Sequence, residues 1–179
     1  PDEISKIQED EYKYGVFSST VKDILNIDDV LIYSIKEIED APVYTYVSQF
    51  GRTKPLDDLS DGSLSILALV VSVINSSSDL IIVEEPENSI HPKALLKLID
   101  FLRSFSEEVQ FIVTSHSIAL LNKSSINDLV VSEVNKKGQS YIHNISTSKE
   151  IVTKLKKGYI SFSDELFFGG EDVIMEDED

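Results

Sequence analysis

Two adjacent glutamates, Glu84 and Glu85, end the short apolar run LIIV (80–83). A histidine, His116, follows a second apolar run, VQFIV (109–113), by three residues. In such a set, one carboxylate can hold Mg²⁺, the next can polarise a water molecule, and the imidazole can donate a hydrogen bond to a phosphoryl oxygen. These residue types therefore suit metal-assisted attack of water on a phosphate, once a fold brings them together.

The apolar pattern predicts the elements that carry these residues. Both runs are short, continuous and β-branched, which is typical of parallel strands covered on both faces. Between them, Pro92 suits the first turn of a helix, and the apolar residues from there to Phe105 have helical spacing. Strand, helix and strand in this order predict a parallel sheet, whose ligands bind at the carboxyl ends of the strands. We therefore expect the carboxylates and the imidazole at one edge of the sheet.

A helix start upstream of the paired glutamates can face an anion. Ser60 precedes the helical pattern GSLSILALVVSVI (62–74), which the segment SSSD (76–79) ends. A serine in this place caps a helix, and the free N–H groups and positive dipole of the helix start attract negative charge. Gly62 has no side chain, so the backbone there can approach an anion closely.

The amino-terminal segment has a weaker pattern. Residues 1–18 are polar and acidic with a weak period, and we predict a loosely held lead-in there, with a helix as one alternative. Ser19 and Thr20 can cap a short helix over VKDILN (21–26).

Two pairs of β-rich runs predict antiparallel hairpins on either side of the central pattern. VLIYSIKEI (30–38) and VYTYVSQF (43–50) predict a hairpin or meander, followed by a loop at 51–58. VVSEV (130–134) and QSYIHNI (139–145) predict a second hairpin that closes an edge.

Composition narrows the class of protein. With 179 residues, of which 41% are hydrophobic, the chain suits one domain with a core and is too short for two ordinary domains. Its 32 acidic and 16 basic side chains give a net charge of −16, which repels nucleic acid and anionic membranes. It has no cysteine, and its longest apolar stretch, Ile66–Ile74, is shorter than the ~20 residues of a membrane span. We expect a cytoplasmic protein, not bound to a membrane, whose polyanionic ligand is held mainly elsewhere.

Four short motifs resemble those of ABC-type ATPase heads. In chain order they are Leu59-Ser60-Asp61-Gly62-Ser63, which resembles the signature loop; LIIVEEPE (80–87), which resembles the Walker B strand with its catalytic glutamate; SIHP (89–92), which falls where the D-loop falls; and IVTSHS (112–117), which resembles the switch-histidine segment. They follow the family's order within residues 56–131. The resemblance is strongest to the OLD, RecF and SMC group, which are soluble ATPases often tied to DNA maintenance or phage defence.

The resemblance implies a role for each matching residue. Glu84 would take the Walker B place in the metal shell, Glu85 would polarise the attacking water, and His116 would sense the γ-phosphate. Two heads of this family close around ATP, so the signature loop would face the nucleotide of the opposing head. The residues implied in that contact are Ser60, Asp61, Gly62 and Ser63 of the signature and His91 of the D-loop. ATP and Mg²⁺ are the implied cofactors, a homodimer of heads is the implied assembly, and an effector protein or DNA would bind through other parts.

Several residues depart from the family's pattern. Asp61 and Ser63 stand where glycine and glutamine are commoner, and Asp61 puts a negative charge near the expected γ-phosphate. Glu84 replaces the usual aspartate and lengthens the reach to a metal by one methylene. His91 stands where many relatives carry aspartate, and a helix cap before Pro92 explains it as well as a D-loop contact does.

The phosphate-binding Walker A loop has no match. No GxxxxGK[ST] occurs in the chain, and Gly169-Gly170 is followed by Glu171 and Asp172, whose charge is wrong for phosphate. In the family this loop precedes the signature. We therefore expect Pro1 to begin partway through a head, with the Walker A half on preceding sequence or on another chain.

The predicted architecture is the carboxyl-terminal lobe of a parallel-sheet α/β P-loop NTPase, the head of an ABC-type ATPase, with flanking helices and an edge β-hairpin. We divide the chain into a lead-in with a short helix and a β-rich segment (1–55), a core lobe with the four motifs (56–146), and a carboxyl-terminal basic helix with an acidic tail (147–179).

Three functions compete. The leading one is a lobe that, with the missing Walker A half, binds and hydrolyses ATP at a two-head dimer interface, in DNA maintenance or phage defence. The alternative is a catalytically degenerate regulatory or scaffolding subunit, motivated by the lost Walker A loop and by Asp61. A metal-dependent nuclease built from Glu84, Glu85, Glu87 and His116 ranks last, because such sites need three or more convergent acids. Glu84 and Glu85 alone also fit a solvated turn, but their combination with His116 and the signature favours a functional site.

Overall fold

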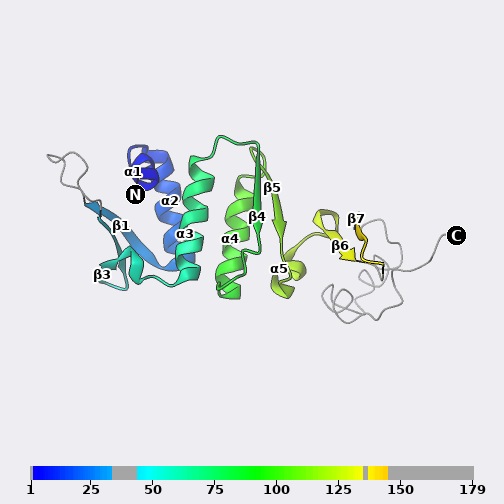
Figure 1. Ribbon diagram of the computed structural model, residues 1–179. Helices are drawn as coiled ribbons and strands as arrows, with labels where there is room; N and C mark the ends of the chain where they lie inside the picture. Colours follow the sequence, from blue (N-terminus) through cyan, green and yellow to red (C-terminus); the bar gives the residue numbers. More distant parts are fainter. Residues whose placement is uncertain (1, 34–43, 135–136, 145–179) are drawn as a thin grey trace. The chain divides into compact units, whose positions relative to one another are not determined.

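The computed structural model describes residues 2–33, 44–134 and 137–144, and the chain divides into two compact units (Figure 1). The first unit is Pro1–Ser115 and the second is His116–Asp179. The first unit contains a parallel strand pair among helices, so the predicted α/β class is confirmed.

The amino-terminal segment is helical, which agrees with one alternative for the lead-in, but it is well packed, so the predicted loose packing is wrong. It forms two helices that contact each other, α1 (Asp2–Gln8) and α2 (Glu11–Leu25). Ile7 is 0% exposed and Phe17 is 1% exposed. These apolar residues are sparse among polar ones, so the sequence gives no clear helical period, but their burial anchors both helices to the core.

The cap predicted at Ser19 and Thr20 is also wrong, because α2 begins earlier. Its N-cap is Asp10, whose side chain accepts a hydrogen bond from the backbone N–H of Lys13 at 3.0 Å. Ser19 lies inside the helix, where its hydroxyl donates to the carbonyl of Val16 at 3.0 Å. Aspartate is as good a cap as serine, and here its carboxylate pairs one of the N–H groups that the first turn of a helix leaves without a partner.

The first β-rich region forms an antiparallel sheet. Its strands, in spatial order, are β1 (Ile27–Tyr33), β2 (Tyr44–Gln49) and β3 (Arg52–Pro55). The pairing of β1 with β2 confirms the predicted hairpin or meander, but the loop predicted at 51–58 is wrong because β3 and the 3-10 turn η1 (Leu56–Asp58) lie there. Phe50 and Gly51 both have positive φ (53 and 70), as a tight two-residue hairpin turn requires. The polar residues of β3 hide this edge strand in the sequence.

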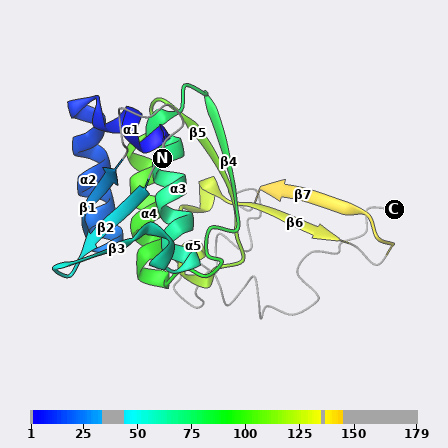
Figure 2. The same cartoon turned by 60° about the vertical axis from the view of Figure 1, so that its left-hand side comes forward.

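The central pattern folds as predicted. Its elements are α3 (Asp61–Asn75), β4 (Leu80–Glu84), α4 (Pro92–Ser104) and β5 (Gln110–Thr114). The strands β4 and β5 are parallel, with Leu80 opposite Gln110 and Glu84 opposite Thr114. Helices α3 and α4 lie on the same side of this pair (Figure 2).

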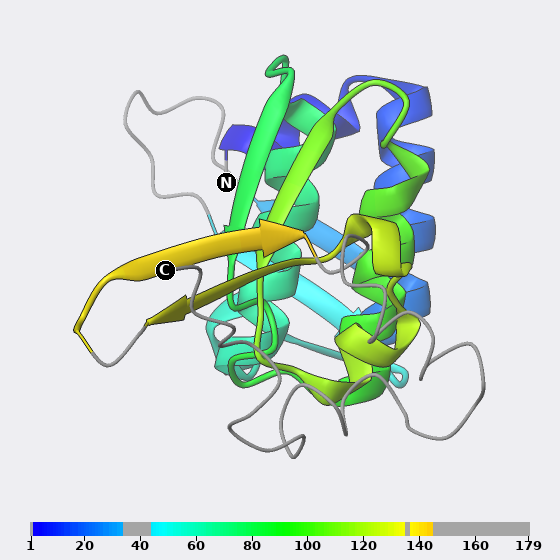
Figure 3. The same ribbon diagram turned by 90° about the vertical axis from the view of Figure 1, so that its right-hand side faces the viewer.

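The helices of the first unit form its middle layer. They lie between the antiparallel sheet β1–β3 and the parallel pair β4–β5 (Figures 1 and 3). Val70 of α3 and Leu98 of α4 are 0% exposed, and Leu95 of α4 is 1% exposed. Burial of such aliphatic side chains contributes about 1.5–3 kcal/mol each, so this layer is the core that holds both sheets.

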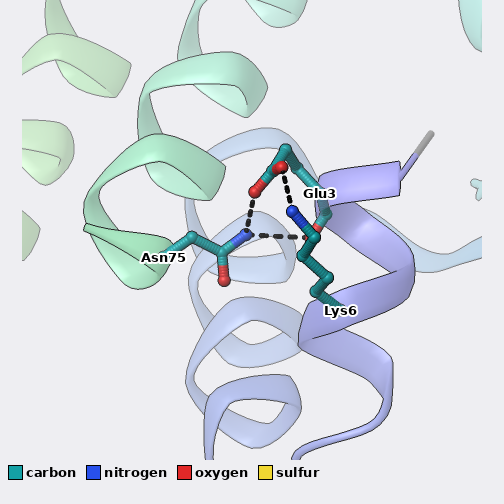
Figure 4. Close-up of polar contacts among 3 residues, drawn as sticks. All are labelled: Glu3, Lys6 and Asn75. Atoms are coloured by element: carbon teal, nitrogen blue, oxygen red, sulfur yellow. Dashed lines mark hydrogen bonds and ion pairs between the residues drawn. The ribbon is translucent and has the colours of Figure 1, made fainter. Parts of the chain in front are cut away.

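Polar contacts join the ends of these helices. The side-chain amide of Asn75 in α3 donates to the backbone oxygen of Glu3 at 2.9 Å and to its Oε2 at 3.1 Å, while Lys6 Nζ lies 2.6 Å from Glu3 Oε1 (Figure 4). Lys97 of α4 contacts Asp23 of α2, with Nζ 2.6 Å from Oδ1. Glu3, Lys6 and Asp23 are largely exposed and only Lys97 is half-buried, so these contacts fix helix orientation more than they stabilise the fold.

Among the described residues of the first unit, one face of the parallel pair lacks cover, although the sequence predicts cover on both faces. Leu80 is 45% exposed, Ile82 is 60% exposed and Ile112 is 45% exposed. The register puts these three side chains on one face of the pair, while Val83, on the opposite face, is buried. The aliphatic run is therefore explained by helices on one side only.

The second unit contains a short helix and a hairpin. The helix α5 spans Ile118–Lys123 and is followed by the 3-10 turn η2 (Ile126–Asp128). The strands β6 (Val130–Val134) and β7 (Ser140–Asn144) pair in antiparallel fashion, which confirms the second predicted hairpin. They form a two-stranded sheet of their own, so the predicted closure of an edge stays a prediction. The helix predicted at 147–157 and the acidic tail lie outside the described residues. The predicted domain limits at 55 and 146 stay a prediction.

Candidate functional site

The paired glutamates lie at the carboxyl edge of the parallel pair, as predicted. Glu84 is the last residue of β4, and its partner in register is Thr114, the last residue of β5. Glu85 leaves the strand with a positive φ of 42, and its backbone N–H donates to the carbonyl of Thr114 at 2.9 Å. Both glutamates are exposed. The strand end thus presents two adjacent carboxylates to the solvent.

A tight turn after Glu85 holds its side chain. The backbone N–H of Asn88 donates to the carbonyl of Glu85 at 3.0 Å, and the side-chain amide Nδ2 of Asn88 donates to Glu85 Oε2, also at 3.0 Å. Ser115 Oγ donates to Glu87 Oε1 at 2.7 Å, which ties the turn to the end of β5. Asn88 and Ser115 are not among the residues selected from the sequence, because these contacts depend on a turn geometry that residue types alone do not reveal.

The predicted cap at Ser60 is confirmed. Ser60 precedes α3 with extended backbone angles, and its Oγ accepts a hydrogen bond from the backbone N–H of Ser63 at 3.3 Å. The hydroxyls of the two serines lie 3.0 Å apart. Asp61 is exposed in the first turn, where its charge suits the helix dipole but opposes an incoming phosphate.

Gly62 faces a protein backbone in this structure. A Cβ added at Gly62 would lie only 2.0 Å from the carbonyl oxygen of Ser89 and 2.8 Å from its carbonyl carbon. Gly62 is buried, and Ser89 adopts a positive φ of 62. From the sequence, we explained the glycine at position 62 by the close approach of an anion. The structure shows that glycine is needed there because the turn that follows β4 contacts this backbone. This contact brings the start of α3 and the turn after Glu85 together.

His91 caps the helix that follows. Its Nδ1 accepts a hydrogen bond from the backbone N–H of Lys93 at 3.2 Å, and Pro92 occupies the first helical turn. Of the two interpretations of His91, the structure shows the helix cap. A D-loop contact with a nucleotide stays a prediction.

His116 and the paired glutamates belong to different units. His116 is exposed and begins the second unit, whereas Glu84 and Glu85 lie in the first. Their proximity therefore stays a prediction, which follows from the place of His116 two residues after the end of β5.

The donor set at the strand end fits Mg²⁺ better than a metal held by protein alone. Within residues 2–33, 44–134 and 137–144, no group of three or more histidine, aspartate or glutamate side chains is arranged to hold a metal ion. Mg²⁺ is usually bound through one or two carboxylates together with waters and phosphate oxygens of a substrate, which an exposed Glu84 can satisfy.

The antiparallel sheet carries a depression away from the candidate residues. A shallow depression of about 370 Å³ on the antiparallel sheet is lined by Tyr33, Tyr44, Tyr46 and Thr53, and contains none of the candidate residues.

In the described ranges, the helices fall short of the length and apolar character needed to cross a membrane.

The family follows from a comparison of the sequence with family models. Residues 2–122 match the family described as "AAA domain, putative AbiEii toxin, Type IV TA system". This match covers more than half of the chain and includes α1 to α4, the candidate strand end and the turn after it. The chain belongs to this family of AAA-type ATPase domains.

One curated relative is the Septu protein PtuA of Bacillus mycoides (strain KBAB4). It is 22% identical over 127 residues, which are 66% of this chain and 17% of PtuA. The chain thus spans less than a fifth of the length of that relative.

Solved structures of SMC heads have a similar fold. One is described as "Structural biochemistry of ATP-driven dimerization and DNA stimulated activation of SMC ATPases"; it has a TM-score of 0.57 and 15% identity, and the match covers 81% of this chain and 89% of that one. Another, an SmcHead bound to the C-winged helix domain of ScpA, has a TM-score of 0.59 and 14% identity, with 77% and 43% covered. These similarities support the predicted P-loop NTPase head fold.

Proposed function

We propose that this chain is the catalytic lobe of an ATPase head, which hydrolyses ATP in a pocket completed by a separate half that bears the Walker A loop. The observation that carries the proposal is the placement of Glu84 and Glu85 at the carboxyl edge of β4 and β5, beside the turn that packs on the start of α3. In parallel α/β sheets this edge is where ligands bind.

Each candidate residue has a physical task in this proposal. Glu84 holds Mg²⁺, which neutralises charge on the phosphates when it is bound. Glu85 accepts a hydrogen bond from the attacking water and orients it towards the γ-phosphate. His116 donates to a γ-phosphate oxygen. The capped start of α3, with Ser60, Asp61, Gly62 and Ser63, and His91 of the turn face the nucleotide of a second head.

The open face of β4–β5 supports the need for a further half. Parallel strands are normally covered on both faces, whereas the helices of this unit cover only one face of the pair. The exposed side chains of Ile82 and Ile112 would be buried by a helix of that half packed on this face, while its strands would extend the sheet. With a net charge of −16, the chain has little attraction for a triphosphate, so the cations that anchor ATP belong to the other half.

The biological setting stays part of the proposal. The sequence resemblance points to DNA maintenance or phage defence. The family description names a toxin–antitoxin system, and one similar SMC structure is described by DNA-stimulated activation. The coupled effector is therefore a protein or DNA bound through other parts.

The test is ATP hydrolysis by the complete protein, with the Walker A half present. Glu85→Gln keeps the size of the side chain but removes the carboxylate that orients water, so we expect kcat to fall by about a hundredfold or more. Because ATP still binds, nucleotide-bound dimers should accumulate, as measured by light scattering after size exclusion. Glu107→Gln, which removes an exposed carboxylate beyond α4, is the matched control and should hydrolyse ATP normally. Unchanged turnover in Glu85→Gln would show that Glu85 is not the catalytic residue.

A regulatory subunit without catalysis is the second candidate, and the exposed Asp61 at the start of α3 favours it. The same assay separates the two. A degenerate head would assemble with its partner half and yet hydrolyse no ATP, in the wild-type protein as in the variant.

A further inference from the structure

Asn88 makes two hydrogen bonds with the proposed catalytic residue. Its backbone N–H closes the turn on the carbonyl of Glu85, and its Nδ2 donates to Glu85 Oε2, each at 3.0 Å. The second bond joins an amide donor to a carboxylate, which makes it stronger than a bond between neutral groups. Asn88 thus holds both the backbone and the side chain of the residue that we propose orients the water.

The turn that carries Asn88 is supported independently of its side chain. Glu85 N–H is bonded to Thr114, Glu87 is bonded to Ser115, and Ser89 packs on Gly62. Asn88 itself is exposed. A change of its side chain should therefore alter the hydrogen bond to Glu85 Oε2 while leaving the path of the backbone in place.

An exposed glutamate at the end of a strand needs such support to act on water. A glutamate side chain has several rotamers, and a base contributes to hydrolysis only when its carboxylate lies within hydrogen-bonding reach of the water in a fixed orientation. The amide of Asn88 fixes one carboxylate oxygen, so the remaining freedom of the carboxylate is small.

We propose that Asn88 is a positioning residue that holds the Glu85 carboxylate in the orientation required for attack of water. The inference rests on the proposed function of Glu85. Asn88 acts through Glu85 and affects the hydrolysis step rather than the binding of ATP.

The isosteric variant Asn88→Asp separates positioning from turn formation. Aspartate is as suitable as asparagine in a turn, but it replaces the N–H donor with a carboxylate that faces Glu85 and repels it. Alanine removes the donor without adding charge. In the complete protein we expect kcat to fall by about tenfold in Asn88→Ala, from loss of a charge-assisted hydrogen bond, and further in Asn88→Asp, with KM for ATP unchanged in both. If Asn88 only shapes the turn, Asn88→Asp should be at least as active as Asn88→Ala.

Two controls complete the experiment. Asn127→Asp makes the same charge change at an exposed asparagine of the second unit, and it should leave kcat unchanged. In a Glu85→Gln background, Asn88→Ala should cause no further loss, because a residue that acts through another has no effect once that residue is replaced. Thermal unfolding of each variant should match that of the wild type.

The outcomes distinguish this inference from the proposed function. The role of Asn88 alone would be overturned by one combination of results. The wild type is active, Glu85→Gln is inactive, and Asn88→Asp is at least as active as Asn88→Ala. A loss expressed in KM instead of kcat, or a further loss in the Glu85→Gln background, would do the same. A complete protein that hydrolyses no ATP would overturn both proposals together.

Discussion

At the scale of single residues, the contact between Gly62 and Ser89 constrains the site most tightly. The two residues come from different motifs, and the carbonyl of Ser89 occupies the place that a methyl group at position 62 would need. Carbonyl and Cα can touch in this way only if one partner has no side chain. Gly62 is therefore required by packing, independently of any ligand.

Gly62→Ala should destabilise the protein. The added Cβ would be 2.0 Å from a backbone oxygen, so the turn or the start of α3 must shift, at a cost of about 1–3 kcal/mol in the free energy of unfolding. Gly15→Ala is a matched control, because Gly15 lies in α2 with nothing within 4 Å of an added Cβ. That variant should be more stable than the wild type by about 0.5–1 kcal/mol. Urea unfolding measures both, and equal effects of the two substitutions would contradict the contact.

At the scale of elements, the sequence predicted best where apolar residues recur at a regular period. The crossover β4–α4–β5, the cap of α3 at Ser60 and both hairpins follow from such patterns. The first part of α2 was missed because its few apolar residues are spread among polar ones, and β3 was missed because its residues are mainly polar and mostly exposed.

In the candidate site, too, the sequence predicted some features and missed others. The positions of Glu84 and Glu85 at a strand end follow from the run LIIV and the rule for parallel sheets. The bond from Asn88 to Glu85 and the packing of Gly62 on Ser89 depend on positive φ at Glu85 and Ser89, which are not glycines. Non-glycine residues rarely adopt this conformation, so no sequence pattern announces it.

Variants of Ser60 separate its structural role in α3 from its proposed nucleotide contact. Ser60→Ala loses the bond to the N–H of Ser63, and should lower the free energy of unfolding by about 1 kcal/mol. Ser60→Asp keeps a good cap and should unfold like the wild type, but its charge adds to that of Asp61 where a phosphate is expected. We therefore expect ATP-dependent dimerisation to weaken in Ser60→Asp, measured by light scattering with ATP. Dimers as stable as those of the wild type would argue against a nucleotide at this helix start.

At the scale of the whole molecule, two features point to a partner. The chain has a large negative charge, and the parallel pair has an open aliphatic face. The first disfavours binding of a triphosphate by this chain alone, and the second resembles half of a sheet core. Under the proposed function, a positively charged half with a helix packed on this face would account for both.

Ile82→Lys tests that explanation. In the complete protein the face would be buried, so a lysine there should lower the free energy of unfolding by more than about 2 kcal/mol, because its charge loses water without gaining a partner. Ile142→Lys, at a side chain that is 75% exposed in β7, is the matched control and should change the stability by less than about 0.5 kcal/mol. Thermal and urea unfolding provide the comparison. Equal tolerance of both lysines would mean that the face of β4–β5 stays open to solvent.

The packing of α3 on the turn also has a mechanical consequence. Two surfaces in van der Waals contact, with no side chain between them to yield, transmit a push directly. If a ligand that docks on the start of α3 shifts this helix, the turn that carries Glu85 must shift with it, because no flexible side chain separates the two backbones. Under the proposed function, this contact would couple a nucleotide that docks on the start of α3 to the orientation of the Glu85 carboxylate.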